Sequence, residues 1–141
     1  MKILVAADGS RYTKRMLAYL ATHDEWLGAK ANQFTVVTVV GAIPPRAASA
    51  LSKKIVQDHY ADEAAKILKP IRAFFGKRGI GATFMHRVGD AGEQIAELAT
   101  KGKYDLAMLG SHGHGALARM VLGSVTSRVL AMCEVPLLIV R

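Results

Sequence analysis

Residues that could hold a phosphate without a catalytic side chain lie near the end of the sequence. Gly110 and Gly113 are separated by two residues, and nine more lead to Gly123-Ser124, with Thr126 just beyond. Glycines let backbone amides approach an anion closely, and the amides and dipole of a helix N-terminus attract negative charge. Because a helical pattern begins near Ser124, we predict that this segment binds a phosphate-bearing ligand.

The segment differs from two common nucleotide motifs. No Gly-Lys-Ser/Thr closes it, as a Walker A loop requires, and Gly113-His-Gly115 lacks the third glycine of a dinucleotide fingerprint. His112 and His114 have no cysteine or third histidine at ligand spacing. We therefore interpret them as neutral imidazoles that line a polar loop rather than as a metal site.

The composition fits one compact domain over residues 1–141, since 51% hydrophobic residues are enough for a core on two sides of a sheet. No apolar run approaches the roughly 18 residues of a membrane span, and Asp8 interrupts the N-terminal run, unlike a signal peptide. We expect a cytoplasmic protein without membrane insertion. Cys133 is the only cysteine, so no internal disulfide can form.

The net charge of +8 favours anionic partners. The basic residues of the chain are scattered among predicted helical positions. They do not alternate with aromatic residues on a strand, as basic residues do on RNA-binding platforms. A small anionic ligand is therefore preferred over nucleic acid as the partner.

Short apolar runs that alternate with segments of helical periodicity indicate strands followed by helices. We predict strands over residues 2–7, 34–40, 82–88, 104–109 and 136–140. We predict helices over residues 12–27, from about 51 to an end at 77–79, over 90–98 and over 124–132. Pro70 is expected to kink or divide the second helix, Asp90 and Glu93 resemble a capping box for the third, and residues 41–46, with two prolines, are expected to be irregular.

This alternation predicts a single doubly wound α/β domain with a five-stranded parallel sheet and helices on both faces. If the first strand is central, the strand order is 3-2-1-4-5. The direction of winding then changes between the first and fourth strands, where a ligand crevice forms. Asp8 and the Gly110 loop would lie on opposite sides of that crevice.

These features resemble the universal stress protein family. Ala7-Asp8-Gly9-Ser10 follows the first strand, and the similarity extends over essentially the whole chain. Members that bind ATP have Gly, two residues, Gly, nine residues, Gly and then Ser or Thr, whereas other members lack these glycines. Gly110, Gly113, Gly123 and Ser124 match that pattern, so the chain resembles the ATP-binding branch.

The resemblance implies a role for each part of the motif. Asp8 would contact the ribose, small apolar residues would line the adenine pocket, and Gly110 and Gly113 would wrap the phosphates, with Mg²⁺ bridging phosphate oxygens and water. The predicted nucleotide-binding residues are Ala6, Ala7, Asp8, Val39, Leu109, Gly110, Gly113, Gly123, Ser124, Val125 and Thr126.

Structural interpretations of the same residues stay open. Asp8 could cap the first helix, Ser124 could be an N-cap without a phosphate, and Gly123 could serve close packing alone. Turnover of ATP is expected to be slow or absent, because the loop offers neither a carboxylate base nor a lysine. The enzyme alternative is an ATPase that uses Arg46 or Arg119 with a histidine.

The last strand is apolar on both faces and yet ends the sheet, which favours association with another chain. The resemblance implies a homodimer, since family members commonly pair their final strands antiparallel across a two-fold axis. A further alternative is therefore an interaction module that dimerises and binds a client protein without nucleotide.

Overall fold

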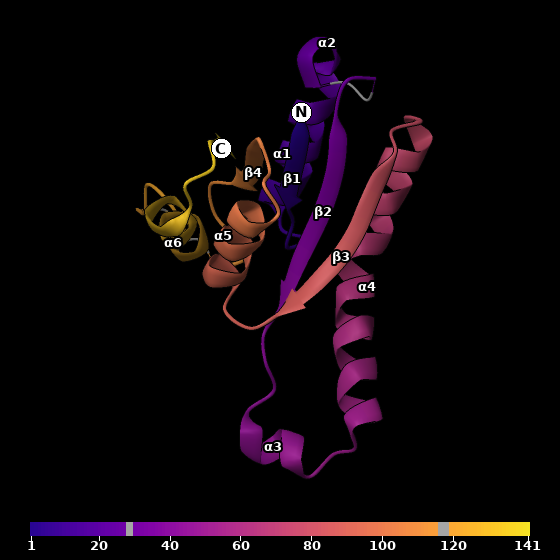
Figure 1. Ribbon diagram of the computed structural model, residues 1–141, viewed down its shortest axis with the longest axis vertical. Coiled ribbons are helices and arrows are strands. Elements are labelled where there is room, and N and C mark those ends of the chain that lie inside the picture. Colours follow the sequence, from indigo (N-terminus) through magenta and orange to yellow (C-terminus); the bar gives the residue numbers. More distant parts are fainter. Residues whose placement is uncertain (28–29, 116–118) are drawn as a thin grey trace.

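A computed structural model describes residues 1–27, 30–115 and 119–141. Its five parallel strands form one sheet in the order β3-β2-β1-β4-β5 (Figure 1). The strands are β1 (Lys2–Ala6), β2 (Gln33–Val40), β3 (Ala82–Val88), β4 (Leu106–Gly110) and β5 (Leu137–Val140). The predicted order, with the first strand at the centre, is confirmed.

Helices cover both faces of this sheet. They are α1 (Arg11–Thr22), α2 (Asp24–Leu27), α3 (Pro45–Ser49), α4 (Lys53–Lys77), α5 (Ala91–Lys101) and α6 (Ser124–Met132). Apolar residues of α1 and α4 pack on one face, and those of α5 and α6 pack on the other. The doubly wound α/β architecture is thus confirmed. No described helix is long and apolar enough to cross a membrane.

Three helix predictions were wrong in detail. The first helix ends at Thr22, whose hydroxyl donates to the carbonyls of Ala18 and Tyr19, and Leu27 belongs to α2 instead. Pro70 does not divide α4. Proline has no N–H to donate to the carbonyl one turn earlier in the helix, but Pro70 is exposed, so that carbonyl can bind water instead. The segment expected to be irregular runs into α3, where Pro45 suits the first helical position.

The turn after β1 brings Asp8 to the carboxyl end of the sheet. Ala7 N still donates to Val37 O at 2.9 Å, and Gly9 then adopts a φ of 76°, which suits glycine. The Ser10 hydroxyl accepts from Tyr12 N and caps α1. Since β1 pairs with β4 as well as β2, the Asp8 turn lies beside the end of β4.

Candidate functional site

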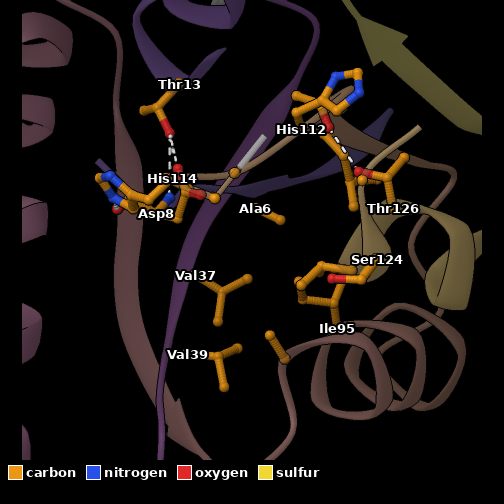
Figure 2. A pocket seen from close by; sticks show the side chains of 18 of the residues that line it. Ala6, Asp8, Thr13, Val37, Val39, Ile95, His112, His114, Ser124 and Thr126 are labelled. Atoms are coloured by element: carbon orange, nitrogen blue, oxygen red, sulfur yellow. Dashed lines mark hydrogen bonds between the residues drawn. The ribbon is translucent and has the colours of Figure 1, made fainter. Parts of the chain in front are cut away.

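A cavity of about 420 Å³ opens at the carboxyl ends of β1 and β4 (Figure 2). Its volume falls in the range of small-molecule sites. The described residues that line it come from β1 and the turn after it, β2, α1, α5, the end of β4 with the segment that follows, and the first turn of α6. All of the predicted nucleotide-binding residues are among them, so the crevice expected at the switch point is present.

One part of the cavity is apolar. Val37 and Val39 lie two residues apart on β2 and therefore point to the same face of the sheet. Figure 2 shows both side chains directed into the cavity, with Ala6 and Ile95 nearby. Ile95 belongs to the buried face of α5. This wall suits a flat ring of low polarity.

Asp8 is held at the other side of the cavity by the turn that follows it. Its Oδ1 accepts from Ser10 N at 2.9 Å and from the Thr13 hydroxyl at 3.0 Å, and that hydroxyl accepts from Asp8 N at 3.1 Å (Figure 2). No hydrogen bond within the described part of the chain uses Oδ2. The N-cap of α1 is Ser10, so the interpretation of Asp8 as the helix cap is wrong.

The first turn of α6 has no cap. Gly123 is its N-cap residue and makes no side-chain hydrogen bond, and Ser124 is the first helical residue, so the N-cap interpretation of Ser124 is wrong. Among the described residues, the amides of Ser124, Val125 and Thr126 have no hydrogen-bond partner. These residues line the cavity, where their N–H groups and the helix dipole favour an anion.

Glycine is needed at the three motif positions for different structural reasons. A β-carbon on Gly110 would lie 2.6 Å from Tyr12 Cβ, and one on Gly123 would lie 3.0 Å from His112 Cα. Both glycines are therefore needed for close packing. For Gly123, this agrees with the interpretation that it serves close packing. A β-carbon on Gly113 would instead lie 2.8 Å from Asp8 Oδ2, so Gly113 keeps space open in front of the carboxylate.

Side-chain and backbone hydrogen bonds hold the glycine loop against β4. The Thr126 hydroxyl donates to Gly110 O at 2.8 Å, and Gly123 N donates to Ser111 O at 2.8 Å. His112 joins the Ser111 hydroxyl through Nδ1 and donates from Nε2 to Met120 O at 2.8 Å. The amide of Gly123 and the hydroxyl of Thr126 are thus already engaged within the protein.

His114 links the two sides of the crevice. Its Nε2 donates to the Asp8 carbonyl oxygen at 2.7 Å. In the described part of the chain, no three His, Cys, Asp or Glu side chains are grouped so that they could hold a metal ion. The contacts of both histidines are those of residues that position the loop.

Several lining residues are not among the predicted nucleotide-binding residues, and they are Thr13, Val37, Ala91, Ile95, His112, His114, Gly115 and Met120. Val37 could have been found, because it shares a strand face with Val39. Met120 carried no signal, since it lies inside the irregular spacer of the motif. Arg46 and Arg119 are exposed and do not line the cavity.

The doubly wound parallel sheet, with an open, glycine-lined crevice at its switch point, defines the protein as a member of the α/β class in which ligands commonly bind at the carboxyl ends of the strands. The model of the universal stress protein family matches residues 1–141. The chain therefore belongs to the universal stress protein family.

Two curated relatives match nearly the whole chain. The chain is 29% identical over 149 residues to universal stress protein YxiE of Bacillus subtilis, which covers 99% of this chain and 98% of the relative. It is 26% identical over 140 residues to universal stress protein MJ0531 of Methanocaldococcus jannaschii, covering 99% and 81%.

Solved structures share the fold. The hypothetical protein MJ0577 superposes with a TM-score of 0.80 at 24% identity, covering 99% of this chain and 94% of that one. A universal stress protein family protein from Arabidopsis thaliana with AMP bound has a TM-score of 0.71 at 16% identity, covering 99% and 90%. A universal stress protein in complex with cAMP has a TM-score of 0.65 at 21% identity, covering 100% and 96%.

We expect Gly110→Ala to lower the free energy of unfolding by about 1–3 kcal/mol, because the new methyl group would overlap Tyr12. Gly41→Ala is the matched control, since in the part of the chain that the structure describes nothing lies within 4 Å of a β-carbon there. Urea unfolding of both variants measures the difference. Equal stability of the two variants would show that Gly110 is not required for packing.

Proposed function

We propose that the protein binds an adenine nucleotide, with ATP as the first candidate, and works as a cytoplasmic stress-response or signalling module. The observation that carries this proposal is the uncapped first turn of α6, whose amides face a cavity with an apolar wall at its other side. Structures of family members with AMP and with cAMP support it. ATP, AMP and other adenylates differ in their phosphates, so the part of the site that binds phosphate would determine which of them is preferred.

Different residues of the cavity would contact the base, the ribose and the phosphates of a nucleotide. The adenine ring would lie against Val37, Val39 and Ile95, which need no polar partner. Asp8 Oδ2 would accept protons from the ribose hydroxyls. The phosphates would then reach Gly113 and the amides that begin α6, with the Ser124 hydroxyl as a further donor.

Magnesium would come to this site with the nucleotide. Asp8 is the one carboxylate among the described lining residues, and its Oδ1 is already occupied by Ser10 and Thr13. Mg²⁺ needs near-octahedral oxygen ligands and keeps several waters. The phosphate oxygens and water would therefore be its main ligands, with the protein binding the complex through the nucleotide.

Binding is favoured over hydrolysis by the charges of the site. No Lys or Arg is among the described residues that line the cavity. Transfer of a γ-phosphate also requires a positioned water, and Oδ1 of Asp8, the one carboxylate among the described lining residues, already accepts from Ser10 and Thr13. The state that a client protein would read is therefore the occupancy of the cavity.

We expect any turnover of ATP by the purified protein to be slow and unchanged in Arg46→Ala and in Arg119→Ala, since both side chains are exposed and lie outside the described cavity lining. Release of inorganic phosphate under single-turnover conditions measures this. A loss of turnover in either variant would favour the ATPase alternative.

Gly113→Ala is expected to weaken ATP binding at least about tenfold, because its methyl group would displace the Asp8 carboxylate or the ligand beside it. Gly115→Ala is the control in the same loop, since no atom of the described residues lies within 4 Å of a β-carbon at that position. Calorimetric titration with ATP and Mg²⁺ compares them. Equal affinities in wild type and Gly113→Ala, or no binding to the wild type, would contradict the proposed site.

We further propose a homodimer that forms through β5. This strand ends the sheet, and its residues are only partly buried. Pro136 O and Val140 O accept from Ala107 N and Ser111 N of the β4 side. Because alternate residues of a strand present their backbone groups to opposite sides, Ile139 N would point to the free edge and could pair with a second copy.

Ile139→Pro is expected to shift the protein from dimer to monomer while the fold is retained, since proline removes an edge donor and none of the bonds to β4. Ile139→Val is the conservative control. Size-exclusion chromatography with light scattering gives the molecular mass. A wild-type monomer, or a dimer that survives in Ile139→Pro, would contradict pairing through β5.

A further inference from the structure

A second, shallow hollow lies beside the cavity on the side of α1. It is lined by Ser10, Arg11, Gly113 and His114. Gly113 and His114 also line the cavity, so the two spaces share a wall made by these two residues. At Gly113 no side chain separates the two spaces.

Arg11 gives this hollow the positive charge that the described lining of the cavity lacks. One amino group of its guanidinium donates to the Tyr12 hydroxyl at 3.0 Å, and the guanidinium carbon lies 5.0 Å from the centre of the Tyr12 ring. No ion pair in the described part of the chain involves Arg11. A neutral ring therefore positions the guanidinium, while its remaining N–H groups can bind an anion.

A short series of contacts leads from α6 to Arg11. A β-carbon on Gly123 would lie 3.6 Å from Gly113 N, and a β-carbon on Gly113 would lie 2.8 Å from Asp8 Oδ2. Asp8 Oδ1 accepts from Ser10 N at 2.9 Å, and Ser10 precedes Arg11. A phosphate chain that starts at the first turn of α6 and passes over Gly113 would thus end beside Arg11.

The charges along this path require a cation at its end. A β-carbon on Gly113 would lie 2.8 Å from Asp8 Oδ2, so the carboxylate repels a phosphate that passes over Gly113. The amides of α6 offset this repulsion only for the phosphates that lie next to them. The guanidinium of Arg11 is placed to offset it for the phosphate farthest from α6.

We propose that the hollow holds the terminal phosphate of a nucleoside triphosphate, and that Arg11 makes the site prefer a triphosphate to a monophosphate. This inference rests on the proposed function and deepens it, because it names the residue that senses the length of the phosphate chain. A monophosphate engages the first turn of α6 and does not reach Arg11.

The test is calorimetric titration of the full-length protein with AMP, ADP and ATP in the presence of Mg²⁺. We expect the wild type to bind ATP more tightly than AMP. Arg11→Gln should lower the affinity for ATP about tenfold, as expected for the loss of a charged hydrogen bond, and leave the affinity for AMP within about twofold.

Arg15→Gln is the matched control. The Arg15 guanidinium carbon lies 5.3 Å from the centre of the same Tyr12 ring, so the two variants lose the same charge on the same helix. Arg15 is absent from the described lining of both the cavity and the hollow. Its loss should leave the affinities for all three nucleotides within about twofold.

The outcomes separate the two proposals. If the wild type binds none of the three nucleotides, the proposed function is wrong and the role of Arg11 is wrong with it. If the wild type binds ATP and Arg11→Gln binds all three as the wild type does, or loses affinity for all three equally, only the role of Arg11 is wrong. An equal loss of ATP affinity in Arg15→Gln would show a general charge effect and would also overturn it.

Discussion

The uncapped start of α6 is the constraint on which the site depends. A helix that begins without a capping side chain leaves several amides without partners, and here those of Ser124, Val125 and Thr126 lie at a cavity. The arrangement is kept in place by neighbouring bonds rather than by a cap, since the Thr126 hydroxyl holds the end of β4 and Gly123 N holds Ser111. The polar groups that hold the helix in place are thus different from the amides that remain available to a ligand.

The need for both close packing and free space at the cavity explains why the loop is rich in small residues. Gly110 and Gly123 let α1 and the His112 backbone approach so closely that the loop can be held against β4. Gly113 has a different effect, because it leaves the Asp8 carboxylate accessible from the cavity. A spacing that would be taken as one anion-binding motif is therefore made of packing residues and one residue that opens space.

The sequence predicted the fold correctly, and the residues that it proposed for the site line one cavity, because both depend on regular patterns. Apolar runs alternating with helical periods determine a doubly wound sheet, and the strand order then brings Asp8 next to Gly110 although they are far apart in the chain. Val39 was predicted to line the cavity, and its strand-face neighbour Val37 could have been predicted from the same alternation.

Contacts that depend on side-chain direction could not be predicted. Spacing alone does not reveal whether a missing β-carbon makes room for a ligand or for Tyr12, nor that the Thr126 hydroxyl turns toward a carbonyl. The absence of Arg119 and Arg46 from the described cavity lining was equally hidden, as was the continuity of α4 through an exposed Pro70. Each of these depends on a neighbour that is distant in sequence or on solvent.

The most direct measurement is a titration of ¹⁵N-labelled protein with ATP and Mg²⁺, followed through the backbone amide resonances. If the first turn of α6 binds phosphate, the amides of Gly113, Ser124, Val125 and Thr126 should shift together and saturate at one common dissociation constant. Saturable shifts confined to other parts of the chain, or no saturable shift at these amides, would contradict phosphate binding at the start of α6.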